Sequence, residues 1–237
     1  MRVDELATPK NDAELFETDP DALLISPFMT GDVFAGVTCG DETVDVAIAG
    51  HPCVIRGGGG QLMTRVPCCL LKPTEDAIAY EDWPEGHFDK FPLPNDLGLG
   101  GNQAIRLLDW ASVHKREFQR ARRKVALTER GVYIFQQRFT HALARVAVPL
   151  PEYEVASKAV LREAGLEVEW VDSLVGNPTD DKAITKTVKS FHKFLDEPDG
   201  EGPATRRGLL RHAGGDTALT KLVRIEIKRR QQEGAAE

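Results

Sequence analysis

A short run of reactive side chains, His51-Pro52-Cys53, stands three residues before Arg56. A cysteine becomes a nucleophile when a neighbouring base or positive charge lowers the pKa of its thiol. On a β-strand, His51 and Cys53 would share one face, because side chains alternate along a strand. No third group that would orient His51 is identifiable, and cysteine–histidine hydrolases usually take their histidine from a distant part of the chain. We therefore favour a turn at Pro52 over a catalytic thiol at Cys53.

All four cysteines lie in the first third of the chain. Zinc sites commonly pair cysteines as Cys-x-x-Cys, which is absent here, and adjacent cysteines on a strand point to opposite faces. Free cysteines are often buried as small hydrophobic residues. We expect reduced structural thiols and no cofactor, with a metal site built from His51, Cys53 and another cysteine as the alternative. The four are Cys39, Cys53, Cys68 and Cys69.

The most basic segment is residues 115–124, in which one carboxylate, Glu117, opposes six cations. On a helix, four of the cations would fall on one side. Like charges on one face repel each other, so an anionic partner should offset them, and phosphate is the common one. The alternative is that the acidic N-terminal arm or the turn at 196–201 covers this face. The six cations are Lys115, Arg116, Arg120, Arg122, Arg123 and Lys124.

The composition indicates a soluble protein with a packed core. The chain has 237 residues, of which 41% are hydrophobic, and a formal net charge of −7. No apolar run approaches the roughly 20 residues that a membrane span needs, and the N-terminus lacks the apolar core of a signal peptide. We expect a cytoplasmic protein with no membrane partner. The negative charge argues against uniform coating of nucleic acid but permits a local basic face.

Short apolar runs separated by Gly and Pro fill residues 22–71 and predict β structure. Alternation favours strands at 43–49 and 61–71, and another strand is expected to begin at Val54-Ile55. The four glycines of 57–60 are interpreted as a flexible hairpin loop, because glycine adopts backbone conformations that other residues avoid. No helix separates these strands, so they predict a small antiparallel barrel or a curled sheet.

Helical periodicity dominates the second half of the chain. Before it, residues 73–101 are rich in Pro and Gly and predict an irregular loop that aromatic side chains pin to the sheet. Gly165 is the expected C-terminal cap of one helix. Glu163 and Glu167, at helical spacing, are interpreted as a solvated surface pair. Helices are expected at 102–115, 132–144, 153–164 and 183–195.

The run Thr30-Gly31-Asp32-Val33-Phe34, followed by a strand and by Gly50-His51-Pro52-Cys53-Val54, resembles the opening of the MazF/PemK family of plasmid-maintenance toxins. The resemblance covers about residues 24–72. Members of that family are small SH3-like barrels that cleave RNA as dimers, so the resemblance implies such a barrel and a metal-independent ribonuclease activity. His51 stands where the family places an arginine before the proline. Under this resemblance the groups that handle a proton and a phosphate would be His51, Arg56 and Arg65.

Together these patterns predict an α+β protein, with a small antiparallel barrel or curled sheet followed by a helical C-terminal half. A mobile acidic arm (1–20) precedes a β-rich SH3-like barrel with an irregular loop (21–101). A helical region packed on the barrel (102–175) and a C-terminal helical extension (176–237) follow.

Three functions are compatible with this organisation. We expect a non-enzymatic, nucleic-acid-associated or accessory binding protein, acting in antiviral defence against phage or in plasmid maintenance, whose basic segment meets nucleic acid or an acidic protein partner. The first alternative is a MazF-like endoribonuclease toxin. The second is a structural subunit of an oligomer or multiprotein complex, joined through the apolar helix at 132–144.

Overall fold

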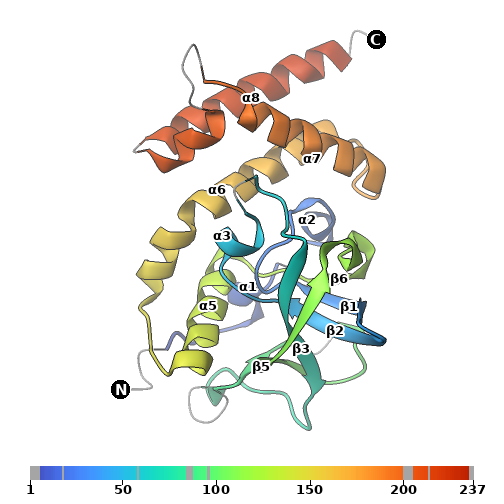
Figure 1. The fold of residues 1–237 in the computed structure, drawn as a ribbon, viewed down its shortest axis with the longest axis vertical. Helices are drawn as coiled ribbons and strands as arrows, with labels where there is room; N and C mark the ends of the chain where they lie inside the picture. Colours follow the sequence, from blue (N-terminus) through green and yellow to red (C-terminus); the bar gives the residue numbers. More distant parts are fainter. Residues whose placement is uncertain are drawn as a thin grey trace. The chain divides into compact units, whose positions relative to one another are not determined.

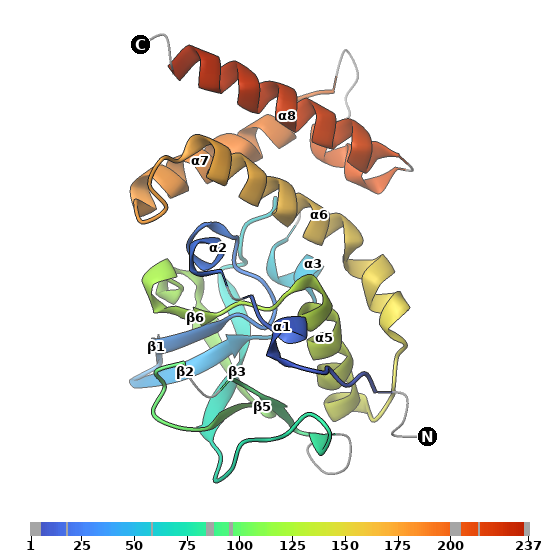
Figure 2. The ribbon, with the colours of Figure 1, turned by 180° about the vertical axis from the view of Figure 1, so that it is seen from behind.

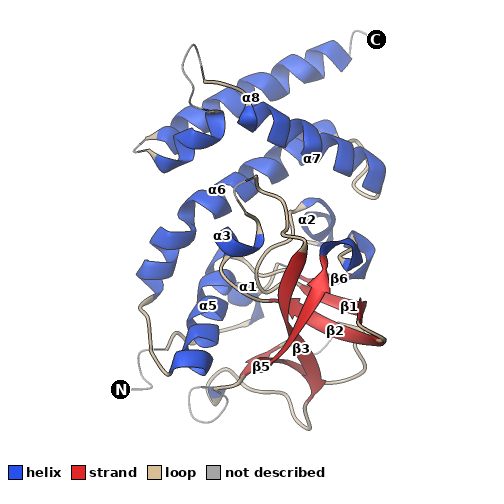
Figure 3. Ribbon diagram, viewed as in Figure 1, coloured by secondary structure: helices blue, strands red, loops and turns tan. Residues whose placement is uncertain are grey.

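A computed structural model describes residues 6–17, 19–57, 59–83, 88–94, 97–199, 205–212 and 214–234. The protein is α+β, with one antiparallel sheet and several helices (Figures 1 and 3). Its contacts divide the chain into two units. The first joins residues 1–19 to 28–157, and the second joins 20–27 to 158–237. The division at 157 falls inside the region that was expected to form one helical layer.

The first unit is built on a six-stranded sheet in which every neighbouring pair is antiparallel (Figure 2). The spatial order is β4-β5-β3-β2-β1-β6. Strands β1 and β5 also contact each other without being hydrogen-bonded neighbours, so the sheet curls. The strands are β1 (Val33–Cys39), β2 (Glu42–Ile48), β3 (Arg65–Pro73), β4 (Lys90–Pro92), β5 (Gln103–His114) and β6 (Arg123–Val125).

Alternating side chains give this sheet two apolar faces, each with its own core. On β3, Cys69 and Leu71 belong to the first core, whereas Val66 and Cys68 belong to the second. The expected opposition of Cys68 and Cys69 is therefore confirmed. The helix α5 (Glu129–Ala144) also contributes side chains to the first core. The helical segments are α1 (Asp12–Leu15), α3 (Pro52–Ile55), α5 (Glu129–Ala144), the start of α6 (Leu150–Leu174), and the 3-10 turns η2 (Lys115–Glu117) and η3 (Arg120–Arg122).

The helix expected at 102–115 is wrong, because this segment forms β5. Ile105 faces the first core and Val113 the second, although both positions are odd. A bulge explains the change of face: residues 107–109 have no counterpart on β3 and interrupt the pairing. The bulge breaks the two-residue period of a strand, so the apolar spacing imitates that of a helix.

Three further expectations are corrected. The strand expected at Val54-Ile55 is the one-turn helix α3, since Pro52 stands at its first turn, where a proline is favoured. Helix α6 continues through Gly165 to Leu174, because its later turns bury Trp170 in the second unit. The acidic arm is not free in its described part: α1 places Leu15 in the first core.

Other predictions are confirmed. The strand at 43–49 is β2, and the helices at 132–144 and 183–195 are α5 and α7 (Asp181–Asp196). In the irregular loop, Trp83 and Phe91 are fully buried. Helix α5 is itself a core element, with Ile134 and Phe135 fully enclosed. It is therefore not the free interface that the structural-subunit hypothesis requires.

The second unit is helical. Trp170 and Phe191 lie at the centre of its main core, which also takes in Leu219 and Val223. In the ranges that the structure describes, no helix combines the length and the apolar character needed to cross a bilayer. The elements of this unit are α2 (Pro20–Ile25), the rest of α6, α7, the 3-10 turn η4 (Arg206–Arg211) and α8 (Gly215–Gly234).

Gly131, at the start of α5, touches the backbone of the N-terminal segment. A Cβ atom at this position would collide with the carbonyl oxygen of Leu15, which is backbone and cannot rotate away. We expect Gly131→Ala to lower the free energy of unfolding by about 2 kcal/mol or more, although alanine favours helices. Denaturant unfolding measures this change.

The matched control is Gly165→Ala in α6, where the added methyl group has no neighbour within 4 Å. This substitution should raise the free energy of unfolding by about 1 kcal/mol, through helix propensity alone. Equal effects of the two substitutions would contradict the close packing at Gly131.

Candidate functional site

The basic segment forms two 3-10 turns and a short strand, so the expected one-sided cationic helix is wrong. Arg123 begins β6 and points inward, where its side chain is 2% exposed and lies 2.7 Å from the Oδ2 atom of Asp32. Arg122 is half-buried, and its Nη1 donates to a backbone carbonyl of β1 at 2.9 Å. Lys115 and Arg116 are exposed. The segment therefore presents only part of its charge to solvent.

Arg65, which belongs to a different part of the sequence, joins the exposed end of the basic segment. It begins β3 and pairs with His114, the last residue of β5. The backbone N–H of Lys115 donates to the carbonyl oxygen of Thr64 at 3.0 Å, which holds the two segments together. Arg116 follows directly. Three exposed cations, Arg65, Lys115 and Arg116, thus gather at one end of the sheet.

An exposed aromatic ring shares a sheet face with Arg65. Trp110 is 57% exposed and stacks on Phe139 of α5, with ring centroids 5.6 Å apart. Its Nε1 donates to the carbonyl oxygen of Leu107 at 2.7 Å, which fixes the ring. Because side chains alternate, Trp110 and His114 point to the same side of β5, about 14 Å apart along the strand. We call this surface the exposed strip: Arg65, Trp110, Ser112, His114, Lys115 and Arg116.

One carboxylate, that of Glu117, forms an ion pair with the exposed strip among the residues described. It lies 3.8 Å from Nε of Arg116 and 3.7 Å from Nη1 of Arg122. Neither Arg65 nor Lys115 has an acidic side chain within 4 Å in the described part of the chain. The strip is therefore only partly neutralised by the protein itself.

Asp32 is completely enclosed and forms an ion pair with the buried arginine of the basic segment. Burial raises its pKa to about 6, although the charge of Arg123 and a 2.8 Å hydrogen bond from the backbone N–H of Met29 act in the opposite direction. Its Oδ1 has no hydrogen-bond partner among the described atoms. Desolvation thus outweighs the ion pair, and the carboxylate holds the start of β1 to β6.

Arg56 belongs to the same buried group of charges and not to the exposed strip. It is 4% exposed, its Nη1 lies 3.5 Å from the carbonyl oxygen of Phe28, and its charge helps to lower the pKa of the buried carboxylate. The guanidinium groups of Arg120 and Arg123 lie over the ring of Phe28, at 5.3 and 5.6 Å. Arg56 and Arg65 were predicted to act together, but they occupy different surroundings. Lys124, also in the basic segment, is half-buried.

Both ring nitrogens of His51 are engaged. Nδ1 accepts the backbone N–H of Cys53 at 3.2 Å, so Nε2 carries the proton and lies 3.2 Å from Oγ of Ser157. Burial lowers the pKa of His51, which favours the neutral ring. Gln136 donates to the same Ser157 hydroxyl at 3.3 Å. In this tautomer His51 cannot take a proton from Ser157, so the pair is not a nucleophile with its base.

The cysteines show no sign of activation. Cys53 is exposed, and partial burial raises the pKa of its thiol, the reverse of what a nucleophile needs. Burial raises the pKa of Cys69 to about 12 and that of Cys68 further. All four thiols are free. In the described ranges no three His, Cys, Asp or Glu side chains lie close enough to share a metal ion.

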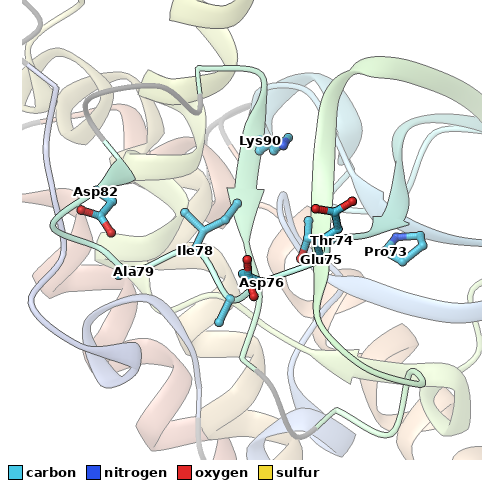
Figure 4. Close-up of a pocket in the computed structure, with 9 residues that line it drawn as sticks. Pro73, Thr74, Glu75, Asp76, Ile78, Ala79, Asp82 and Lys90 are labelled. Carbon is cyan, nitrogen blue, oxygen red and sulfur yellow. The ribbon is translucent and has the colours of Figure 1, made fainter.

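A hollow of about 440 Å³ lies in the loop between β3 and β4, shown in Figure 4. Three carboxylates, those of Glu75, Asp76 and Asp82, line it together with the amine of Lys90. Its charge is opposite to that of the exposed strip. An anionic ligand would be repelled here, so this hollow is not a second part of the strip.

The second unit contains a buried ionic cluster that the sequence analysis missed. Glu163 and Glu167 are 8% and 2% exposed, so the expected solvated pair is wrong. Nε2 of His192 lies 3.4 Å from Glu167, and Arg207 forms an ion pair with Glu163. One signal was present: both carboxylates lie on the helical stripe that also carries Trp170, which points into the core.

No protein-family model matches the sequence, and no curated protein matches it significantly. Function is therefore inferred from the residues and their geometry.

Asp32 should make the stability of the protein depend on pH. Its pKa rises from 3.8 to about 6 on folding, so between these values the folded protein binds more protons than the unfolded chain. The stability that such a group contributes is present at low pH and is lost as the pH rises through the folded pKa. We expect the free energy of unfolding to fall by about 3 kcal/mol between about pH 4 and pH 6.5 on account of this group.

Urea unfolding of the wild type and of Asp32→Asn across this pH range measures the effect. The substituted protein should lack this component of the slope, whatever its absolute stability. Asp41→Asn, at an exposed position, is the control and should keep the slope. An unchanged slope in Asp32→Asn would show that another group titrates.

Proposed function

We propose that the protein binds single-stranded nucleic acid, without cleaving it, through the exposed strip. The supporting observation is that an exposed and fixed tryptophan shares a sheet face with Arg65, one of three exposed cations that gather at the end of that sheet. Cations follow the phosphate backbone, and a base that stacks on an aromatic ring contributes about 1–3 kcal/mol. A duplex does not present free base faces, so this combination favours single strands. We place this activity in phage defence or plasmid maintenance on the strength of the toxin-like opening.

An acidic protein partner is the competing ligand for the same cations. Such a partner would need the charges of Arg65, Lys115 and Arg116 but would not need a flat ring beside them. The contribution of Trp110 therefore separates the two ligand classes.

The combined substitution of Arg65, Lys115 and Arg116 by alanine should weaken binding of a labelled 12-nucleotide strand by roughly tenfold or more at low salt. It should also reduce the slope of log K against log salt by about 2, since each lost phosphate contact removes about 0.7. Trp110→Leu should weaken binding by roughly five- to 150-fold with an unchanged slope. Fluorescence anisotropy measures all three quantities.

Lys72→Ala is the matched control, because this exposed cation lies near the opposite end of β3. Intrinsic fluorescence gives an independent readout: Trp83 and Trp170 are fully buried, so quenching by a bound strand reports Trp110. Binding that survives both sets of substitutions would refute the proposal. Binding lost with the cations but indifferent to Trp110 would favour a purely electrostatic partner.

A MazF-like ribonuclease remains the alternative proposal. The observation that favours it is that Gly31-Asp32 leads directly into β1 of a curled antiparallel sheet, as an SH3-like barrel would require. Of its proposed residues, Arg65 is exposed and suited to phosphate, whereas Arg56 is buried. With its proton on Nε2, His51 could accept a further proton only at Nδ1, after the contact of that atom with the backbone N–H of Cys53 opens.

Under this alternative, purified protein should cleave RNA in the presence of EDTA. His51→Ala should lower the rate at least about 100-fold, a typical general acid–base contribution, and Arg65→Ala should lower it through the lost contact with phosphate. Cys53→Ser should leave the rate unchanged. Gel analysis of RNA fragments, with circular dichroism to verify folding, is the measurement. Intact RNA after prolonged incubation rules the alternative out.

A further inference from the structure

A second basic surface lies in the helical unit, between α6 and α8. It is a groove of about 390 Å³, within the size range of ligand sites. Four of the seven side chains that line it are cationic. All residues that line the groove belong to the second unit, whereas the exposed strip belongs to the first. The lining residues are Arg162, Thr217, Thr220, Lys221, Arg224, Ile225 and Lys228.

The cations of α8 form a line. Lys221, Arg224 and Lys228 are separated by three and four residues, so they lie on one face of the helix and span about 10 Å along its axis. From α6, Arg162 reaches across, and its Nη2 donates to the hydroxyl of Thr220 at 2.7 Å. That hydroxyl in turn donates to the carbonyl oxygen of Asp216 at 2.6 Å. The guanidinium is therefore held in place rather than free to swing.

Helix α8 has two charged faces. Carboxylates of the protein neutralise the face beside the groove, whereas they neutralise the groove face only in part. Arg229 and Arg230 both form ion pairs with Glu226, whose pKa these two arginines hold at about 2. On the groove side, Arg224 pairs with Glu169. Lys221 and Lys228 have no carboxylate within 4 Å in the part of the chain that the structure describes. The groove face therefore leaves the charges of Lys221 and Lys228 available to an external anion.

We propose that this groove binds the phosphate backbone of a nucleic acid strand, as a contact separate from the exposed strip. The line of cations is too long for one phosphate and suits an anion whose charges repeat along a chain. Ile225, 56% exposed between them, offers an apolar surface that a sugar can cover and that an inorganic anion would not use. The ligand class rests on the proposed function, but the site does not depend on the exposed strip.

The test compares Lys221→Gln/Lys228→Gln with Arg211→Gln/Arg229→Gln in the full chain. The second pair removes the same charge from exposed positions outside the groove. With a labelled 30-nucleotide strand, loss of two phosphate contacts should lower the slope of log K against log salt by about 1.4. Affinity at low salt should fall at least about tenfold, and the control pair should change neither quantity by a comparable amount. Circular dichroism verifies that both variants fold.

The outcomes separate this inference from the proposed function. If the groove variant binds like its control while the exposed-strip variant is weakened, the groove inference fails and the proposed function stands. If only the groove variant is weakened, the groove is the binding site and the strip is not. Wild-type protein that binds no strand at low salt overturns both. Competition by tripolyphosphate or polyglutamate as effective as that by the unlabelled strand, at equal charge, overturns the groove's assignment to a nucleic acid backbone.

Discussion

The ion pair between Asp32 and Arg123 is the constraint from which the surface of the first unit follows. Asp32 directly precedes β1, and Arg123 opens the edge strand β6, so the pair joins the two across the interior. A buried pair adds little net stability over apolar packing, but separating it is costly, so it fixes which side chains point inward. The basic segment is drawn over the second core, where Phe118 packs on Phe34. The cations before Phe118 face solvent, and those after it are partly or wholly covered.

Sequence patterns predicted those elements in which the apolar period is uninterrupted. Strand β2 and helices α5 and α7 each keep one period throughout, and each was recognised. The wrong predictions arose where a bulge, a short helical turn or tertiary packing interrupts the regular spacing of apolar residues. Residues 107–109 add an odd step to β5, and His51 with Pro52 starts a helical turn where a strand would continue. In α6, tertiary packing overrides the tendency of Gly165 to end a helix.

Several residues of the candidate site could be named from the sequence, but their assembly into one surface could not be predicted. The basic composition of residues 115–124 singled out Lys115 and Arg116, and the family resemblance singled out Arg65. Their proximity depends on the register between β3 and β5, which the sequence does not reveal. Trp110 lies in the segment that was predicted to be a helix, so its position on the exposed side of a strand was not anticipated. The basic segment looked uniform, because nothing local distinguishes a buried arginine from an exposed one. The buried arginine is Arg123, and its ion-pair partner, Asp32, lies about ninety residues earlier in the chain.

The bulge in β5 determines which side chains at the end of this strand are exposed to solvent. Because it contains an odd number of residues, it inverts the two sides of the strand beyond it: Val113 turns into the second core, and Trp110 and His114 turn outward. Gain or loss of a single residue there would reverse the inversion, placing an indole and an imidazole inside and a valine outside. The number of residues in this irregularity thus decides which side chains of β5 beyond it meet solvent.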